Sequence, residues 1–278
     1  MTNFFAIVGP TGIGKTSLSI KLAKKLNSEI IGLDSRQIYK MIPIGTAQPS
    51  EKDLKTVKHH LIGIKDLHES ISAGEFMKLV DNKIAKILEK NKTPIICGGT
   101  GLYLKSLVDG IFIGSKTDTN IRTDIEKEYD NGNSENLYKE LISIDPEYSK
   151  KVHPNNKRRL VRALEIYKIT GKNMTDNFKS ENKKSNFHSH IQTAYLRMSR
   201  KSLESIIHQR TLSMIENGMI EEVQYIKDNK YNIDHIDYIG FSEISSYLEK
   251  KMSKEDVIEK IHIRTRQYAK RQMKWFDN

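Results

Sequence analysis

Short apolar runs alternate with helical patterns along the first hundred residues of the chain. Three runs that are mostly apolar predict β-strands over residues 4–8, 29–33 and 94–97. Between them, apolar residues recur every three or four positions over residues 15–26 and 73–89, which predicts two helices, and a third helix is predicted over residues 102–108. Strands that alternate with helices favour an α/β fold with a parallel sheet flanked by helices.

The pattern changes at about residue 115. Residues 115–185 hold polar loops and helical patterns without a convincing strand, and residues 180–189 are polar, as in a linker. A strand is predicted again over residues 192–198, and helices are predicted over residues 202–217 and 254–275. We therefore expect an α/β core formed by residues 1–114 and 191–278, interrupted by a helical insertion domain of residues 115–190.

Composition and charge narrow the class of protein. Lys and Arg outnumber Asp and Glu by 46 to 35, and the net charge is +11. This excess favours a polyanionic partner such as nucleic acid or a phosphorylated metabolite, and the alternative is a composition that is rich in lysine throughout. The single cysteine, Cys97, excludes an intramolecular disulfide. We expect a cytoplasmic protein with no membrane partner, because neither a signal peptide nor an apolar run of membrane-spanning length is found.

The loop after the first predicted strand has the spacing G-x-x-x-x-G-K-T. It reads Gly9, Pro10, Thr11, Gly12, Ile13, Gly14, Lys15 and Thr16. A glycine-rich loop between a strand and a helix is the setting of a phosphate-binding P-loop, whose backbone N–H groups surround phosphate oxygens. Lys15 adds a positive charge, and the Thr16 hydroxyl can hold Mg²⁺. We therefore predict a phosphate site with Thr16 as a metal ligand and Mg²⁺ as the cofactor.

Two more polar clusters follow the second and third predicted strands. They are residues 34–37, with Asp34 first, and residues 98–101, which contain Thr100 between glycines. Ligands of open α/β sheets bind at the carboxyl ends of the strands, so both clusters should meet the P-loop in one cleft. Asp34 has three open roles: a metal ligand, a base for an attacking group, or the N-cap of a following helix. Thr100 is either a turn residue or a hydroxyl directed at a diphosphate.

Basic residues outside the P-loop supply candidates for anion binding. Arg210 lies in the middle of a predicted helix, where a surface arginine is usual, but a basic partner for a diphosphate is missing elsewhere. The final helix carries six basic residues between His262 and Lys274, counting His262. A solvated face is the common explanation of such a run, and the density here favours contact with a phosphate backbone.

Taken together, these segments resemble the tRNA dimethylallyltransferase family of bacterial type. The matching segments are residues 9–16, 34–39, 44–47, 59–62, 98–103, 158–165, 239–243 and 265–272. They extend over almost the whole chain, and their combination is highly specific although the P-loop alone is generic. Members usually carry Asp and Gln where this chain has Asn156 and Arg158, which leaves the contact made there open.

The resemblance implies a P-loop NTPase-like fold and a specific reaction. A dimethylallyl group would pass from dimethylallyl diphosphate to the exocyclic amine of the adenosine 3′ of the anticodon, in tRNAs reading codons that begin with U. The P-loop would then hold a diphosphate and not ATP. Asp34 would accept a hydrogen bond or proton from the amine, and Thr100 and Arg210 would contact the diphosphate.

The resemblance also implies the macromolecular partner, the anticodon stem-loop of tRNA. The residues expected to contact it are Asp34, Ser35, Arg36, Gln37, Arg158, Arg159, Leu160, Val161, Arg162, Arg266, Lys270 and Arg271. We expect the protein to be a monomer.

Two other functions stay open at this point. In a small-molecule P-loop kinase, Asp34 would activate a hydroxyl group, which explains the first hundred residues but not the basic final helix. An RNA-binding NTPase is disfavoured because Asp34 follows its strand without an acidic neighbour.

Overall fold

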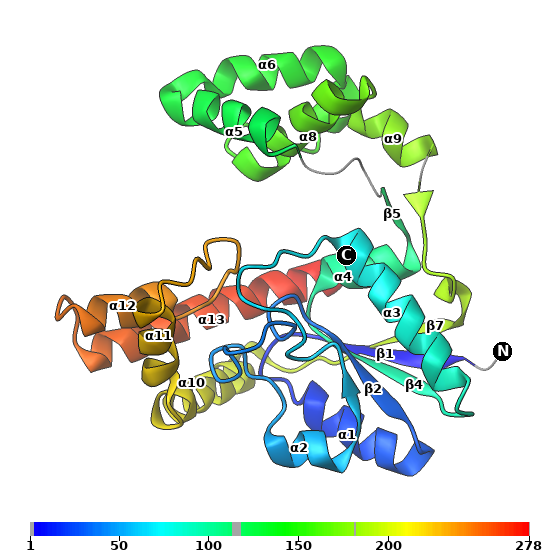
Figure 1. Cartoon of the computed structure of the whole chain (residues 1–278), viewed down its shortest axis with the longest axis vertical. Helices are drawn as coiled ribbons and strands as arrows, with labels where there is room; N and C mark the ends of the chain where they lie inside the picture. Colours follow the sequence, from blue (N-terminus) through cyan, green and yellow to red (C-terminus); the bar gives the residue numbers. More distant parts are fainter. Residues whose placement is uncertain (1–2, 113–117, 181, 278) are drawn as a thin grey trace. The chain divides into compact units, whose positions relative to one another are not determined.

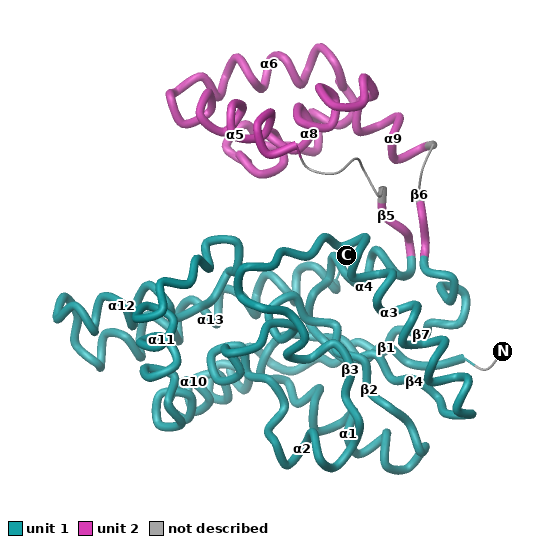
Figure 2. Tube along the Cα trace, in the orientation of Figure 1, with its two compact units in different colours: residues 1–108, 185–278 teal, residues 109–184 magenta. Residues whose placement is uncertain are grey.

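The chain divides into two compact units. A computed structural model describes residues 3–112, 118–180 and 182–277. One unit contains residues Met1–Val108 and Ser185–Asn278, and the other contains Asp109–Lys184 (Figure 2). The predicted boundary at residues 114 and 115 lies outside the described residues. We predicted that the chain re-enters the α/β core at residue 191, but it does so already at Ser185. The N–H of Ser185 donates to the carbonyl of Leu107 in the first unit at 3.3 Å.

A five-stranded parallel sheet forms the centre of the first unit, in the order β3-β2-β4-β1-β7 (strand labels in Figure 2). Figure 1 shows the same sheet as arrows. Its strands are β1 (Phe4–Val8), β2 (Glu29–Leu33), β3 (His59–His60), β4 (Pro94–Gly98) and β7 (Ile191–Tyr195). The first two predicted strands are confirmed with their bounds. The third is one residue longer than predicted, and the last begins one residue earlier and ends at Tyr195. The predicted α/β class and parallel sheet are therefore confirmed.

Helices cover both faces of this sheet. The helix α1 (Lys15–Leu26) lies on one face and α3 (Ala73–Leu88) lies on the other (Figure 1). Ile20 of α1 packs among Ile7, Ile30 and Ile95 of the sheet. Burial of each such side chain contributes about 1.5–3 kcal/mol. The pattern of the sequence predicted both helices to within one residue, α4 (Gly101–Val108) is also confirmed, and the short α2 (Glu51–Thr56) was not predicted.

Four helices complete the first unit after β7 and the 3₁₀ turn η2 (His188–His190) that precedes it. They are α10 (Arg200–Glu216), α11 (Met219–Asp228), α12 (Phe241–Leu248) and α13 (Lys254–Phe276). α10 packs against α13 through Leu203, Ile207 and Ala269. The predicted α10 and α13 are confirmed to within two residues, whereas α11 and α12 were not predicted as separate helices.

The second unit is a small helical bundle, the form predicted for the insertion. Its helices are α5 (Thr119–Glu128), α6 (Ser134–Ile144), α7 (Pro146–Ser149), α8 (Lys157–Thr170) and α9 (Met174–Ser180), with a π-helical turn at Tyr129–Asn133. The two-residue strands β5 (Ile111–Phe112) and β6 (Asn182–Lys183) pair antiparallel. The sequence did not predict this pair, because two residues carry no period that a pattern can reveal.

The core of the insertion corrects one prediction. Leu160 and Val161, expected to contact tRNA, are 0% and 1% exposed and pack with Leu137 and Leu141. A helix turns once in 3.6 residues, so five consecutive residues of α8 cannot all face outward. The expected contact with tRNA is therefore wrong for Leu160 and Val161.

Among the helices of the described residues, none combines the length and the apolar character that crossing a membrane requires.

Candidate active site

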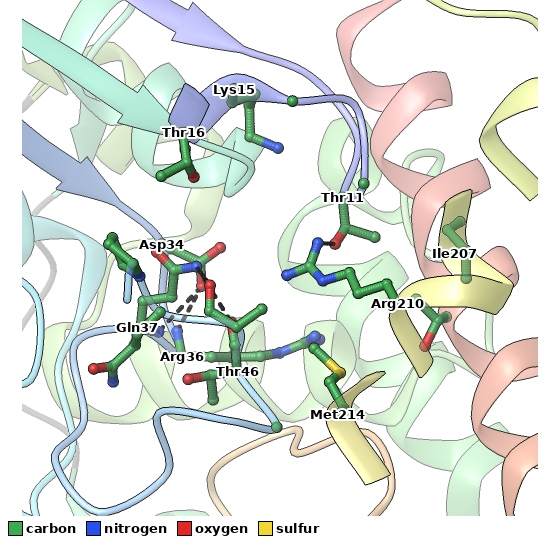
Figure 3. Close-up of a pocket in the computed structure, with 18 of the residues that line it drawn as sticks. Thr11, Lys15, Thr16, Asp34, Arg36, Gln37, Thr46, Ile207, Arg210 and Met214 are labelled. Carbon is green, nitrogen blue, oxygen red and sulfur yellow. Dashed lines mark hydrogen bonds between the residues drawn. The ribbon is translucent and has the colours of Figure 1, made fainter. Parts of the chain in front are cut away.

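A cavity of about 670 Å³ opens in the first unit at the carboxyl ends of the central strands (Figure 3). The polar side of its lining comes from the P-loop, from the segment after β2, and from α10 and α13. The polar residues there include Thr11, Lys15, Thr16, Asp34, Arg36, Gln37, Arg210 and Gln272. The P-loop and the Asp34 cluster therefore meet in one cleft, as the strand-end rule predicted.

The P-loop is shaped by its glycines. Gly12 and Gly14 have φ angles of +83° and +91°, in the left-handed region that a side chain disfavours. Gly14 is also the N-cap of α1 and offers no side-chain hydrogen bond to that helix. The first amides of α1 thus lack a side-chain cap beside the cavity, and a helix N-terminus of this kind favours an anion.

Lys15 is folded back onto the loop that precedes it. Its Nζ donates to the carbonyls of Gly9 at 2.9 Å and Pro10 at 2.8 Å. Burial lowers the pKa of Lys15 to about 8, while the nearby Cys97 and Asp34 act in the opposite direction. Ile13, the loop residue between two glycines, packs against the cluster that joins α10 and α13. The hydrogen bonds of Lys15 and the packing of Ile13 therefore both hold the loop in place. The ammonium group of Lys15 is still cationic at neutral pH.

Asp34 caps the turn that follows β2. Its Oδ1 accepts hydrogen bonds from the N–H of Arg36 at 2.9 Å and of Gln37 at 3.3 Å. Among the described residues, no group donates a hydrogen bond to Oδ2, and Asp34 lines the cavity opposite Arg210 (Figure 3). The capping role is thus realised at a turn and not at a helix, and the second oxygen is available to a ligand.

Arg210 reaches the P-loop from the middle of α10. Its Nη1 donates to Oγ1 of Thr11 at 3.0 Å, across 199 residues of sequence. Burial lowers the pKa of Arg210 and the carboxylate of Asp34 opposes that shift, but a guanidinium group stays charged in proteins. The structure therefore brings Arg210 to the same cavity as Lys15 and Asp34.

Thr100 lies beside this cluster but is not among the described residues that line the cavity. Its Oγ1 accepts from the N–H of Ser35 at 3.0 Å and lies 3.4 Å from the Ser35 hydroxyl, to which it donates. The side chain thus holds the turn after Asp34 against the end of β4. Direct contact between Thr100 and a diphosphate stays a prediction.

An apolar wall completes the cavity, and the sequence did not reveal it. Its residues are Ile206, Ile207, Met214, Met219, Ile239 and Ile261. They come from α10, α11, the segment before α12, and α13, so no single stretch of sequence carries them. One signal was present, because Met214 lies one helical turn after Arg210 and must share its side of α10. The cavity is therefore lined by both charged and apolar side chains.

Arg36 and Gln37, which were expected to contact tRNA, have partners within the protein. The guanidinium of Arg36 lies 4.1 Å from the centre of the Tyr268 ring and forms an ion pair with Asp237 at 2.6 Å. The amide of Gln37 donates to the carbonyls of Thr46 at 3.2 Å and Ala47 at 2.7 Å. Contact of these two side chains with RNA stays a prediction.

The basic residues of α13 point to different sides of the helix. Arg266 and Lys270 line a second groove of about 410 Å³ between α10 and α13, and Arg266 pairs with Glu204 at 2.6 Å. Arg271 instead lies beside Tyr268, with its guanidinium 5.8 Å from the ring centre. Arg266 and Lys270 are four residues apart and share one face of α13, whereas Arg271 is five residues from Arg266 and lies on another face.

The insertion offers a separate set of cations. Arg158 and Arg159 are exposed at the start of α8, and Arg162 pairs with the buried Glu165 at 2.8 Å. Asn156 is the N-cap of α8, and its side chain accepts from the N–H of Arg159 at 3.3 Å. Because Asn and Asp both cap helices well, the departure at Asn156 preserves this local structure.

The cavity has the oxygen ligands that Mg²⁺ prefers. Among the described residues, no cluster of three His, Cys, Asp or Glu side chains is arranged to hold a metal ion alone. The hydroxyl of Thr16 and the carboxylate of Asp34 nevertheless line the same cavity. Mg²⁺ is commonly held by one or two protein oxygens together with substrate phosphates, so the Thr16 hydroxyl fits an ion that arrives with a diphosphate.

Known proteins resemble this chain over most of its length. A family model described as IPP transferase matches residues 37–278. The tRNA dimethylallyltransferase of Halothermothrix orenii is 39% identical over 99% of this chain, which covers 84% of that relative. The tRNA dimethylallyltransferase of Bacillus subtilis is also 39% identical, over 98% of this chain and 87% of the relative.

Solved structures show the same similarity. The tRNA isopentenylpyrophosphate transferase of Bacillus halodurans has a TM-score of 0.69 and 35% identity, and the match covers 100% of this chain and 88% of that one. A eukaryotic dimethylallyltransferase acting on tRNA has a TM-score of 0.83 and 33% identity, over 99% of this chain and 70% of that one.

Proposed function

Because the chain belongs to the IPP transferase family, we propose that it transfers a dimethylallyl group from dimethylallyl diphosphate to tRNA. The acceptor is the exocyclic amine of the adenosine 3′ of the anticodon, in tRNAs reading codons that begin with U, and diphosphate is released. One observation carries the proposal: a P-loop and an apolar wall share one cavity. A diphosphate joined to a short hydrocarbon chain likewise combines a charged part and an apolar part.

The charged groups that line the cavity suit the departing diphosphate. Negative charge grows on the diphosphate oxygen as the carbon–oxygen bond breaks. Lys15, Arg210 and the uncapped amides at the start of α1 border this cavity. Cations and N–H groups beside developing negative charge stabilise a transition state. With the Thr16 hydroxyl as a protein ligand, Mg²⁺ would supply further neutralisation of the diphosphate when bound.

The acceptor amine needs a base because an aromatic amine is a weak nucleophile. As its nitrogen forms the new bond to carbon, the amine must lose a proton. Oδ1 of Asp34 is held by two backbone amides, which fixes the carboxylate plane, and Oδ2 is available to take the proton. A positioned base contributes roughly 10²–10⁴-fold to the rate.

The adenine base must leave its stack to reach this cavity. Extrusion costs less for an unpaired base of an anticodon loop than for a base in a duplex. Cations at exposed positions of both units, such as Arg158, Arg159 and Lys270, are available for contact with the RNA backbone. We infer that tRNA binding draws on these cations.

A label-transfer experiment tests the proposal. The protein is incubated with an unmodified anticodon stem-loop and either dimethylallyl diphosphate labelled in its carbon chain or ATP labelled in its γ-phosphate. We expect carbon label in the RNA and no transfer of phosphate label. An RNA with guanosine in place of the adenosine 3′ of the anticodon serves as the control and should stay unlabelled. Transfer of the phosphate label to a small molecule would instead favour a kinase.

A further inference from the structure

Gln272 of α13 joins two loops at the active site. On the basis of the proposed function, we propose that Gln272 is a positioning residue that orients Thr11 and, through it, Arg210 for the diphosphate of the prenyl donor. The side chain lies in the last third of α13 and lines the cavity.

Both polar atoms of the Gln272 side chain are engaged. Oε1 accepts a hydrogen bond from the N–H of Thr11 at 2.8 Å, and Nε2 donates to the carbonyl of Gly99 at 2.9 Å. The residue is only 6% exposed. A buried amide is costly unless its donor and acceptor are satisfied, and here each has a backbone partner. The two hydrogen bonds therefore fix both the rotamer of Gln272 and the distance between the two loops.

Thr11 links Gln272 to the guanidinium group of Arg210. Its backbone N–H is held by Gln272 from α13, and its hydroxyl accepts from Arg210 of α10. A shift of the Thr11 peptide would move the hydroxyl and release the guanidinium of Arg210. Gln272 thus acts on the diphosphate site through Thr11, without having to touch the diphosphate itself.

The absence of a side chain at Gly99 leaves room for the Gln272 amide. A Cβ atom added at Gly99 would lie 2.3 Å from Nε2 of Gln272 and 3.3 Å from the Gly9 carbonyl oxygen. The φ of Gly99 is not in the left-handed region, so its backbone does not require a glycine. The space occupied by the Gln272 amide is therefore what disfavours a side chain at this position.

A packing role and a positioning role predict different kinetics for Gln272→Met. Methionine has a similar length, so it fills the space but cannot bond Thr11 or Gly99. If Gln272 positions Thr11, the KM for dimethylallyl diphosphate should rise by about tenfold, the effect expected from loss of one or two hydrogen bonds. The KM for the anticodon stem-loop should stay unchanged. Gln267→Met, an exposed glutamine on the same helix, is the matched control and should not alter the KM for the donor.

Gly99→Ala tests the same arrangement without changing Gln272. It should raise the KM for the donor, and the double variant should show little more than the larger single effect, because both changes break one arrangement. This variant also carries the test alone if Gln272→Met does not fold. A lower melting temperature with an unchanged KM for the donor would overturn the inference, as would fully additive effects. Absence of label transfer by the unsubstituted protein would instead overturn the proposed function.

Discussion

At the scale of single residues, Asp34 uses its two carboxylate oxygens for different purposes. Oδ1 caps a turn by accepting two backbone hydrogen bonds, whereas Oδ2 has no such donor among the described residues. The cap orients the group, and the second oxygen is left for the amine of the proposed reaction. The structural and the chemical roles of this residue can therefore be separated by substitution.

We expect Asp34→Asn to lose most of its turnover while keeping its fold. The amide oxygen of asparagine can still cap the turn, but the side chain cannot take a proton at neutral pH. kcat should fall by roughly 10²–10⁴-fold. Asp34→Ala is the paired variant, and it should lose in addition about 1 kcal/mol of unfolding free energy because the cap is gone. Urea unfolding and single-turnover transfer measure the two effects, and near-normal turnover in Asp34→Asn would exclude Asp34 as the base.

The lowered pKa of Lys15 predicts a pH dependence of donor binding. Burial lowers this pKa to about 8 in the folded protein, so the ammonium loses its proton as the pH rises through that value. Donor binding weakens in the same direction, because a neutral amine attracts a diphosphate less than a cation does. We expect kcat/KM for dimethylallyl diphosphate to decline above about pH 8.

Lys15→Ala provides the control for this pH profile. It should have a lower kcat/KM at every pH and should lack the decline above about pH 8, because the titrating group is absent. A decline that persists in Lys15→Ala would assign the titration to another group.

At the scale of elements, the loop around Gly45, which follows β2 and lines the cavity, is held in place by hydrogen bonds to a buried carboxylate. Glu222 of α11 accepts hydrogen bonds from the N–H of Ile44 at 2.8 Å and of Gly45 at 2.9 Å, and from the hydroxyl of Tyr238 at 2.6 Å. Burial raises the pKa of Glu222, and these three donors oppose that shift. Gly45 is needed because a Cβ atom there would lie 1.9 Å from the Tyr238 ring. The position of this loop at the cavity thus depends on α11, a helix that is distant in sequence.

Glu222→Gln is expected to loosen this loop. The amide nitrogen of glutamine cannot accept from a backbone N–H, so one buried donor loses its partner. The cost should be about 1–3 kcal/mol of unfolding free energy. Tyr238→Phe, which removes only one of the three donors, should cost about 1 kcal/mol. Urea unfolding measures both, and a Glu222→Gln protein as stable as the unsubstituted one would contradict a supporting role for this carboxylate.

At the scale of the whole molecule, the chain has a net charge of +11, and exposed cations lie in both units. Arg158 and Arg159 lie in the insertion, and Arg266 and Lys270 lie on α13 of the first unit. Binding of a polyanion by such cations releases counterions, so the affinity falls as salt is added. The charge balance that first suggested a nucleic-acid partner therefore leads to a quantitative test.

We expect the affinity for the anticodon stem-loop to fall steeply with salt, and the fall to be less steep when cations are removed. The double variant Arg158→Ala/Arg159→Ala should reduce the slope of log K against log salt concentration by roughly 0.7–0.9 for each phosphate that is no longer neutralised. Lys24→Ala/Lys25→Ala is the control, because these exposed lysines lie in the last turn of α1, away from the P-loop. Equal slopes for both double variants would exclude Arg158 and Arg159 from the interface with RNA.

Many of the helices and strands were predictable because local patterns of apolar and polar residues specify them. The bounds of α1 and β2 follow from apolar residues at helical and strand spacing, and α3 begins at a capping box of Ser72 and Glu75. The two-residue strands β5 and β6 were missed because they are too short to show a period. Leu160 and Val161 were assigned to an RNA-binding segment because a contiguous motif does not say which of its residues face the core.

The sequence alone determined the P-loop and the charged cluster around it. A contiguous G-x-x-x-x-G-K-T motif sets its own backbone angles, and parallel strands bring their carboxyl ends to one edge, so Lys15 and Asp34 had to meet. Only the tertiary structure decided how distant side chains are joined to the site. Gln272 bonds Thr11 across 261 residues of sequence, and Arg210 does so across 199. Such hydrogen bonds depend on how α10 and α13 pack together and on the sheet, and no local pattern encodes that packing.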